Sequence, residues 1–171
     1  MRVELKPHPA TPCAAVQAIV VDALRDGDAL ALTYRAIGRM EDLAVPAPAF
    51  CERMDELWKH TCFEAFVRGE DGRYCEFNFS PSTQWAAYVF DDYRAGMRDF
   101  EMSALAINAH GGDDWFELKA VVTPGATGLW RVALSAVIEE TSGAKSYWAL
   151  KHPAGKPDFH HAEGFALLLT N

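Results

Sequence analysis

The sequence of 171 residues lacks the motifs that would assign it to a common enzyme class. It contains no GxGxxG fingerprint, no phosphate-binding P-loop and no GxSxG elbow. Nothing in it therefore indicates a dinucleotide enzyme, a nucleoside triphosphatase or a serine hydrolase. No apolar run reaches the ~18 residues of a membrane span. The first residues, MRVELKPHPATPCAAV, lack the continuous apolar segment of a secretory signal.

Positive charge and cysteine pairs are also scarce. The chain has 16 Lys and Arg against 24 Asp and Glu, for a formal net charge of −8. This balance argues against binding to nucleic acids, which needs a basic surface. No CxxC pair occurs, so free, packed thiols in a reducing cytoplasm are the expectation. The four cysteines are Cys13, Cys51, Cys62 and Cys75. Only Cys62 and Cys75 flank one hairpin and could approach each other.

What is present is an ordinary composition for a soluble globular protein, with 50% hydrophobic and 23% charged residues. The length suffices for one domain with a substantial core, and we expect a single domain over residues 1–171. We find no repeats, low-complexity tracts or linkers.

The chain is organised around a hairpin between Trp58 and Pro81. Two aromatic-rich strands, 63–68 and 73–79, flank a turn over residues 69–72. If Arg68 lies opposite Arg73, then Glu64 lies opposite Phe77. This register puts Glu64 and Glu76 on opposite faces, although a single bulge would exchange the faces of one strand. A glutamate on an apolar face must be paired, hydrogen-bonded or open to a pocket.

Further strands are expected where apolar residues alternate between turn signals. In this interpretation residues 41–56 form a long loop with a short helical turn near 51–57. Residues 98–109 show no clear pattern, and residues 110–114 are a loop. The count favours an all-β fold, a two-sheet antiparallel β-sandwich of jelly-roll or immunoglobulin-like type with about 9–11 strands. Besides the hairpin, the expected strands are 2–5, 16–25, 29–37, 83–90, 115–122, 130–138, 146–150 and 165–169.

Several segments together resemble the DOMON-like proteins of bacteria, which are related to family 9 carbohydrate-binding modules. The resemblance covers about residues 29–169. Its clearest pieces are LWKHTCFEAFV (57–67), YCEFNFSPSTQWAAYVFDDYR (74–94), LSAVIEE (134–140), SYWALKHP (146–153) and KPDFHH (156–161). The resemblance implies a β-sandwich and a sugar held between aromatic planes, with polar side chains and often a carboxylate fixing its hydroxyls. Other DOMON domains bind haem, so the ligand does not follow from the fold.

The candidate residues carry two kinds of chemistry. Aromatic rings stack on the C–H faces of sugars, and placed donors and acceptors bind hydroxyls. Trp58 and Trp85 would stack, with packing in the core as the alternative. The others would form hydrogen bonds, although Glu64 could instead pair with His60, Arg68, Arg73 or the backbone. The predicted ligand-binding residues are Trp58, His60, Glu64, Glu76, Asn78, Trp85, Lys156, Asp158 and His160.

We therefore expect a non-catalytic protein without a cofactor or metal that binds a small ligand, in the first place a carbohydrate, and neither nucleic acid nor membrane. Three alternatives stay open. The first is a haem or metal binder using His60, His152 or His160 with Met97 or Met102. The second is a hydrolase using Glu64 and Glu76, which the register disfavours. The third is a module that uses its aromatic residues to bind another protein.

Overall fold

The computed structural model describes residues 1–102 and 105–170, and these residues form an all-β protein. Within them, twelve strands and three short 3-10 helices are found, with no α-helix. The strands are β1 (Arg2–Pro7), β2 (Val16–Asp26), β3 (Ala29–Gly38), β4 (Cys62–Arg68), β5 (Tyr74–Phe79), β6 (Trp85–Phe90), β7 (Arg98–Asp99), β8 (Ala106–Gly111), β9 (Trp115–Val122), β10 (Trp130–Glu139), β11 (Lys145–Ala149) and β12 (Leu167–Leu169). The 3-10 helices are η1 (Met40–Asp42), η2 (Leu57–Lys59) and η3 (Ala162–Gly164).

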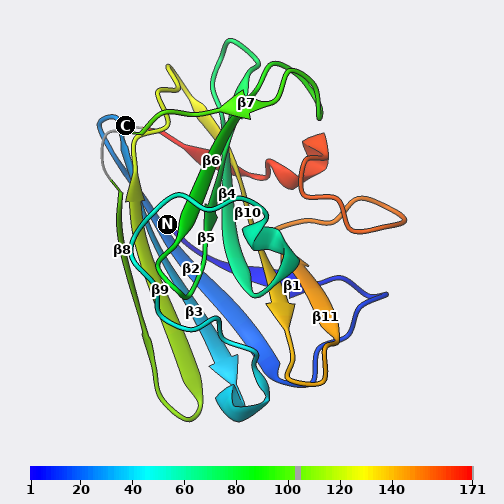
Figure 1. Ribbon diagram of the computed structural model, residues 1–171. Coiled ribbons are helices and arrows are strands. Elements are labelled where there is room, and N and C mark those ends of the chain that lie inside the picture. Colours follow the sequence, from blue (N-terminus) through cyan, green and yellow to red (C-terminus); the bar gives the residue numbers. More distant parts are fainter. Residues whose placement is uncertain (103–104, 171) are drawn as a thin grey trace.

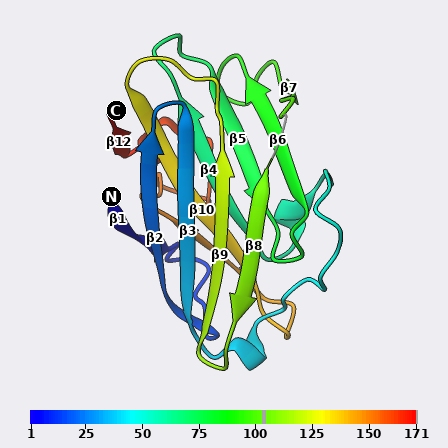
Figure 2. The same ribbon diagram turned by 90° about the vertical axis from the view of Figure 1, so that its left-hand side faces the viewer.

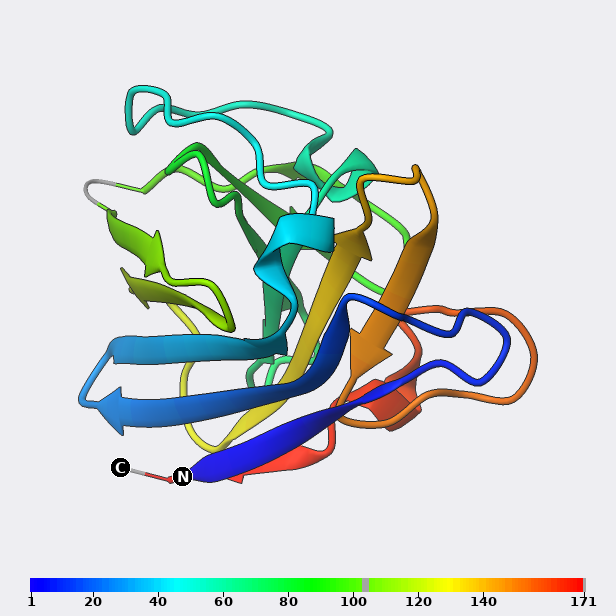
Figure 3. The same cartoon turned by 90° about the horizontal axis from the view of Figure 1, so that it is seen from below.

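The strands belong to one curled antiparallel sheet with the shape of a half-barrel (Figure 1). Its order is β7-β6-β5-β4-β10-β11-β1-β2-β3-β9-β8, and β12 pairs with β10. Strand β1 joins the two halves, because residues 2–5 pair with β2 and residues 6–7 pair with β11. The predicted all-β antiparallel fold is thus confirmed, but the strands form a continuous sheet rather than two separate ones. Figure 3 shows β1 crossing between the halves.

The main core fills the space between the two halves. Strands β2, β3 and β9 have one buried and one exposed face, as their alternating sequences predict, and Figure 2 shows the outer face of this half. Leu32, Tyr34 and Leu118 point inward from them and meet Phe63, Phe77 and Trp130 from the other half. Trp130 and Trp148 are at most 2% exposed and belong to this core.

A second apolar layer, the outer core, covers the opposite face of β4, β5 and β6. The segment 151–166, orange to red in Figure 1, lies over this face. Both faces of β4 and β5 are therefore buried, and no residue of β5 is exposed. This explains why apolar residues occur on both faces of these strands instead of in a simple alternation, with Glu64, Glu76 and Asn78 as the polar exceptions on the outer face. The outer core consists of Leu57, Cys62, Phe66, Tyr74, Ala86, Tyr88, Phe90, Ala133 and Phe165, with Phe159 packed against it.

The predicted register of the central hairpin is wrong by one residue. Arg68 pairs with Tyr74, so Glu64 lies opposite Asn78 and not opposite Phe77. The cause is a five-residue connection, 69–73, in which Arg73 bonds to Asp71 through both its backbone N (3.2 Å) and its Nε (2.8 Å). Because side chains alternate along a strand, this one residue moves every side chain of β5 to the other face. Glu64, Glu76 and Asn78 consequently share one face.

Two other predictions need correction. Strand β8 begins at Ala106, within the segment 98–109 that showed no clear pattern. It ends at Gly111, so it includes two residues of the segment 110–114, where the sequence indicated a loop. The helical turn expected near 51–57 is η2, which begins at Leu57. The four cysteines are free, as predicted. Among the described residues, no helix has the length and apolar character that crossing a membrane requires.

Candidate functional site

A cavity of about 370 Å³ opens on the outer face of the β4–β5–β10 region, beside the outer core. Its floor is the sheet, and its roof comes from η2, the loop 91–97 and the segment 151–161. The volume lies near the lower end of the range of about 300–1,000 Å³ typical for small-molecule sites. The lining residues are Trp58, Glu64, Glu76, Phe90, Arg94, Met97, Val137, Tyr147, Pro157, Phe159 and His160.

Glu64 is the most unusual residue of the floor. It is only 3% exposed, and it lies between Ser135 of β10 and Asn78 of β5 in the strand register. Its Oε1 atom is buried without a hydrogen-bond partner among the described residues, and so is Ser135 Oγ. None of the partners considered from the sequence, His60, Arg68 or Arg73, bonds to this side chain. A buried acceptor with no partner is costly, so a ligand that donates to it gains affinity.

Glu76 is the second carboxyl of the floor, at 6% exposure. In the register it lies one step diagonally from Glu64, because Glu64 pairs with Asn78 and Phe66 pairs with Glu76. Diagonal neighbours have Cα atoms about 7–8 Å apart, within reach of long side chains. Asn78 is fully buried and donates from Nδ2 to Glu76 Oε1 (2.8 Å). Asn78 therefore positions Glu76 and does not itself line the cavity.

Both carboxyls hold protons more tightly than ordinary glutamates. Burial raises the pKa of Glu64 well above its usual value and the charge of Glu76 raises it further, although the neighbouring Ser135 hydroxyl acts in the opposite direction. Burial also raises the pKa of Glu76 to about 7, although the bond from Asn78 and the charge of Arg94 act in the opposite direction. At neutral pH the pair of glutamates is therefore partly protonated.

His160 forms the side of the cavity next to Glu76, with its Nε2 atom 3.7 Å from Glu76 Oε2. Burial, and then the charge of Arg94, lower the pKa of His160 to about 4, so the imidazole is neutral at pH 7. Its Nδ1 lies 2.9 Å from Tyr74 Oη, and that oxygen accepts from Arg94 N (3.2 Å). The Tyr74 hydroxyl is therefore free to donate to Nδ1, which leaves the imidazole proton on Nε2, facing Glu76.

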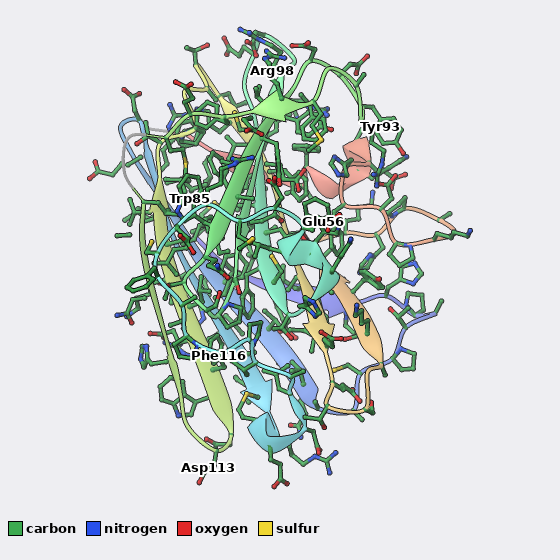
Figure 4. All side chains as sticks on the ribbon, in the orientation of Figure 1. Glu56, Trp85, Tyr93, Arg98, Asp113 and Phe116 are labelled. Carbon is green, nitrogen blue, oxygen red and sulfur yellow. The ribbon has the colours of Figure 1, made fainter. Side chains whose placement is uncertain are left out.

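Asp158 fixes the roof of the cavity. It accepts from Tyr93 Oη (2.6 Å), Arg94 Nη2 (2.8 Å) and His160 N (3.1 Å). Tyr93, labelled in Figure 4, lies next to the C-terminal segment that carries Asp158. Burial acts to raise the pKa of Asp158, but the bonds from Tyr93 and Arg94 outweigh it, so the pKa lies below its usual value. The sequence predicted Asp158 as a ligand-binding residue, whereas in the structure its contacts are with the protein's own loops.

Asp158→Asn is expected to loosen the roof. An amide keeps one acceptor for three donors, and about 1–3 kcal/mol is typical for a donor left without a partner. We expect Tm to fall by a few degrees at pH 7 and proteolysis within 151–161 to become faster. Because the pKa of Asp158 is lowered in the fold, the difference from wild type should vanish as the pH falls through that pKa. Asp113→Asn, in an exposed turn, is the control, and equal proteolysis of both variants would contradict this role.

The mouth of the cavity is aromatic. Trp58, in η2, is 36% exposed, and its ring meets the edge of Tyr88 at 6.1 Å between centroids. Tyr147 and Phe159 form another part of the wall, with their centroids 6.0 Å apart. Met97, 53% exposed, completes the rim. Rings at the mouth and carboxyls at the floor give the cavity an apolar wall and a polar end.

Three predicted residues lie elsewhere. Trp85 pairs with Phe79 and packs against the main core, on the sheet face opposite to Glu64. The labels of Figure 4 show it on the side toward β9. His60 is largely exposed and bonds to Glu139 (2.7 Å). Lys156 lines a separate open hollow outside the cavity. The structure thus brings together Trp58, Glu64, Glu76 and His160, with Asn78 and Asp158 as supports.

The residues proposed for haem or metal do not converge. His152 Nε2 donates to the backbone oxygen of Lys6 (2.8 Å), and its ring lies edge-on against that of His8. His60 instead bonds to Glu139, and His160 bonds to Tyr74. Met97 lies at the cavity mouth, whereas Met102 packs against the main core. Among the described residues, no group of three or more His, Cys, Asp or Glu side chains could hold a metal ion.

Sequence reasoning missed several cavity residues for identifiable reasons. Tyr147 could have been found, because Trp148 belongs to the core and its neighbour must then face outward. Arg94, Met97 and Pro157 lie in loops, where no periodicity shows which way a side chain points. Val137 belongs to a strand that is buried on both faces, so the pattern of β10 gives no face for it.

Comparisons with known proteins give similarity of structure but not of sequence. No protein-family model matches the chain. No curated protein matches it either. A solved structure from Bacteroides uniformis, of a protein named as a candidate for carbohydrate binding, has a TM-score of 0.70 at 13% identity and covers 96% of this chain and 83% of its own.

Two further solved structures are of a family 9 carbohydrate-binding module from Caldicellulosiruptor kristjanssonii. The complex with glucose has a TM-score of 0.50 at 8% identity and covers 81% of this chain and 69% of its own. The complex with cellotriose has a TM-score of 0.50 at 7% identity and covers 85% of this chain and 75% of its own. At these identities the likeness is one of fold. The chain therefore has a fold related to that of family 9 carbohydrate-binding modules.

Proposed function

We propose that the protein binds a small carbohydrate in the cavity above β4 and β5. The observation that carries the proposal is the combination of aromatic side chains at the mouth with a buried, unpartnered carboxylate oxygen, Glu64 Oε1, at the floor. Sugars need this combination, because their ring faces are apolar and their hydroxyls must find partners. The fold related to sugar-binding modules supports the proposal. Membership of the DOMON-like proteins and a cytoplasmic location stay predictions.

In this proposal Trp58 stacks on the sugar ring, and Glu64 and Glu76 bind its hydroxyls. His160 contributes its Nε2–H, and Arg94 lies where a substituent would leave the cavity. Asn78 holds Glu76 in place, and Asp158 holds the roof in place through its bond with Arg94. The cavity is open at one side and small, which suits one end of a saccharide better than the middle of a long chain.

The test is a thermal-shift and calorimetric screen of mono- and oligosaccharides. A ligand at about 100 times its Kd adds about 2.7 kcal/mol to stability, which raises Tm by about 5–10 °C for a chain of this size. Trp58→Ala should weaken binding about tenfold or more, because ring stacking is lost. Phe50→Ala removes an aromatic ring that is 86% exposed and does not line the cavity, and it should bind as wild type does. A flat screen would contradict carbohydrate binding.

One observation favours glycoside hydrolysis as a second candidate function. Glu64 and Glu76 share one face and one cavity, contrary to the sequence prediction. Glycosidases use two carboxyls about 5–10 Å apart, one of them protonated. Aryl glycosides would reveal such an activity, and Glu76→Gln should abolish it. Release of no product from any sugar that binds would reject this candidate.

A further inference from the structure

The floor of the cavity offers acceptors but no cation. Glu64 and Ser135 are paired neighbours with buried side chains, and the Ser135 hydroxyl acts to lower the pKa of Glu64. By strict hydrogen-bond geometry, however, Glu64 Oε1 and Ser135 Oγ have no partner among the described residues. Within the same part of the chain, the only ion-pair contact of either glutamate is that of Glu76 with His160 at 3.7 Å, and His160 is neutral at pH 7. Two carboxyls therefore face one small cavity with no positive charge bound to them.

The nearest permanent cation is already in use. Arg94 bonds to Asp158 at 2.8 Å and is about half exposed at the roof, so its charge is shared with Asp158 and screened by water. No other residue that lines the cavity carries a positive charge. The groups that face the two glutamates from neighbouring elements are Asn78, Ser135, His160 and the Cys62 thiol, and all are uncharged at pH 7.

We propose that the ligand brings this missing charge, and that the protein prefers a sugar with a free primary amine, an amino sugar, with its ammonium group between Glu64 and Glu76. An ammonium group has three donors and no acceptor, which matches a site made of carboxylate and hydroxyl oxygens. Bonds between two charged partners are about twice as strong as neutral ones. This inference rests on the proposed function, because the aromatic wall would hold the ring that carries the amine.

Entry of an ammonium group also has a consequence for the shared proton. A positive charge favours the ionised form of a nearby carboxyl and lowers its pKa. At pH 6.5 the Glu64–Glu76 pair retains protons that an ammonium group would displace into the buffer. A neutral sugar has no such effect. Proton release thus distinguishes charge recognition from simple hydrogen bonding to hydroxyls.

The experiment is titration calorimetry at pH 6.5 with D-glucosamine, D-glucose, N-acetylglucosamine and cyclohexylamine, in two buffers of different ionisation enthalpy. At this pH amines are protonated, because their usual pKa values are about 7.7 or higher. We expect glucosamine to bind at least tenfold more tightly than glucose or N-acetylglucosamine, and to release close to one proton where glucose releases none. Cyclohexylamine, which has the ring and the amine without hydroxyls, should bind more weakly than glucosamine.

The outcomes separate the two proposals. Equal affinity for glucose and glucosamine, without proton release, would overturn the amine preference and leave carbohydrate binding intact. Tight binding of cyclohexylamine and glucosamine alike would show an amine site and overturn the carbohydrate function. Glu64→Gln should reduce the glucosamine-to-glucose ratio toward one, and Glu4→Gln, the same change at an exposed position of β1, should not. An unchanged ratio in Glu64→Gln would contradict the assigned position of the ammonium group.

Discussion

Glu76→Gln is expected to raise the free energy of unfolding at pH 8 by about 1–3 kcal/mol, an unusual direction for a change at a buried residue. The pKa of Glu76 is raised to about 7 in the folded protein from its ordinary value of 4.5. The fold therefore keeps a proton that the unfolded chain releases above pH 4.5. This contribution to stability is complete below pH 4.5 and is lost as the pH rises through 7.

Glutamine avoids this loss because it is neutral at every pH, and its oxygen still accepts from Asn78 Nδ2. The gain should be largest at pH 8 and should disappear near pH 4.5. Glu64→Gln should act in the same direction, and the double variant should gain less than the sum, because each carboxyl raises the cost of ionising the other.

Urea unfolding at pH 4.5, 6 and 8 is the measurement. Glu4→Gln, at an exposed position, is the control for the loss of one negative charge. If the difference in unfolding free energy between Glu76→Gln and wild type is the same at all three pH values, the carboxyl is not held protonated by the fold. If the variant is also defective in ligand binding, the carboxyl is retained for function at a cost in stability.

Phe66→Ala is expected to destabilise the protein by about 3–5 kcal/mol, which corresponds to a fall in Tm of roughly 6–20 °C. Phe66 is fully buried at the centre of the outer core. Its ring lies 5.1 Å from that of His160 and 6.4 Å from those of Tyr74 and Phe165. Truncation would leave a void beneath the segment that roofs the cavity.

Thermal unfolding and hydrogen exchange check this prediction. Exchange should become faster in 151–166 than in the β2–β3 hairpin, because the void lies on the outer face of β4 and not in the main core. Phe50→Ala, at 86% exposure, should change stability by no more than about 0.5 kcal/mol. Uniform loss of protection in both regions would argue that the outer core has no separate role in holding the roof.

The sequence was informative where packing in the core determines the pattern of apolar residues along a strand. The hairpin and the strands β9 and β10 follow from runs of apolar residues between turn signals. Strand β8 was missed because its sequence, AINAHG, is mostly exposed and places only Ile107 and Ala109 against the main core, which is a weak alternation. A strand at the edge of a sheet needs little burial, so periodicity is weak there.

The site was harder to predict because it depends on one turn. The contact of Arg73 with Asp71 adds a residue to the loop, and this addition unites Glu64 and Glu76 on one face. Charge at the turn also disfavours the alternative, because Arg68 and Arg73 would then lie directly opposite each other. The sequence pointed to Asp158 and His160 of the roof but not to the contact with Arg94, since Arg94 and Asp158 meet through loops 64 residues apart.

The joint formed by β1 also determines when the fold can be completed. Lys6 pairs with Ala149, so β1 can link the two halves of the sheet only after the chain has left the ribosome as far as Ala149. The β2–β3 hairpin is local and can form early, whereas closing so long a loop is slow and entropically costly. Until β11 has been synthesised, the end of β1 that pairs with it stays an exposed strand edge. We therefore expect this edge to be the place where nascent chains aggregate or bind chaperones.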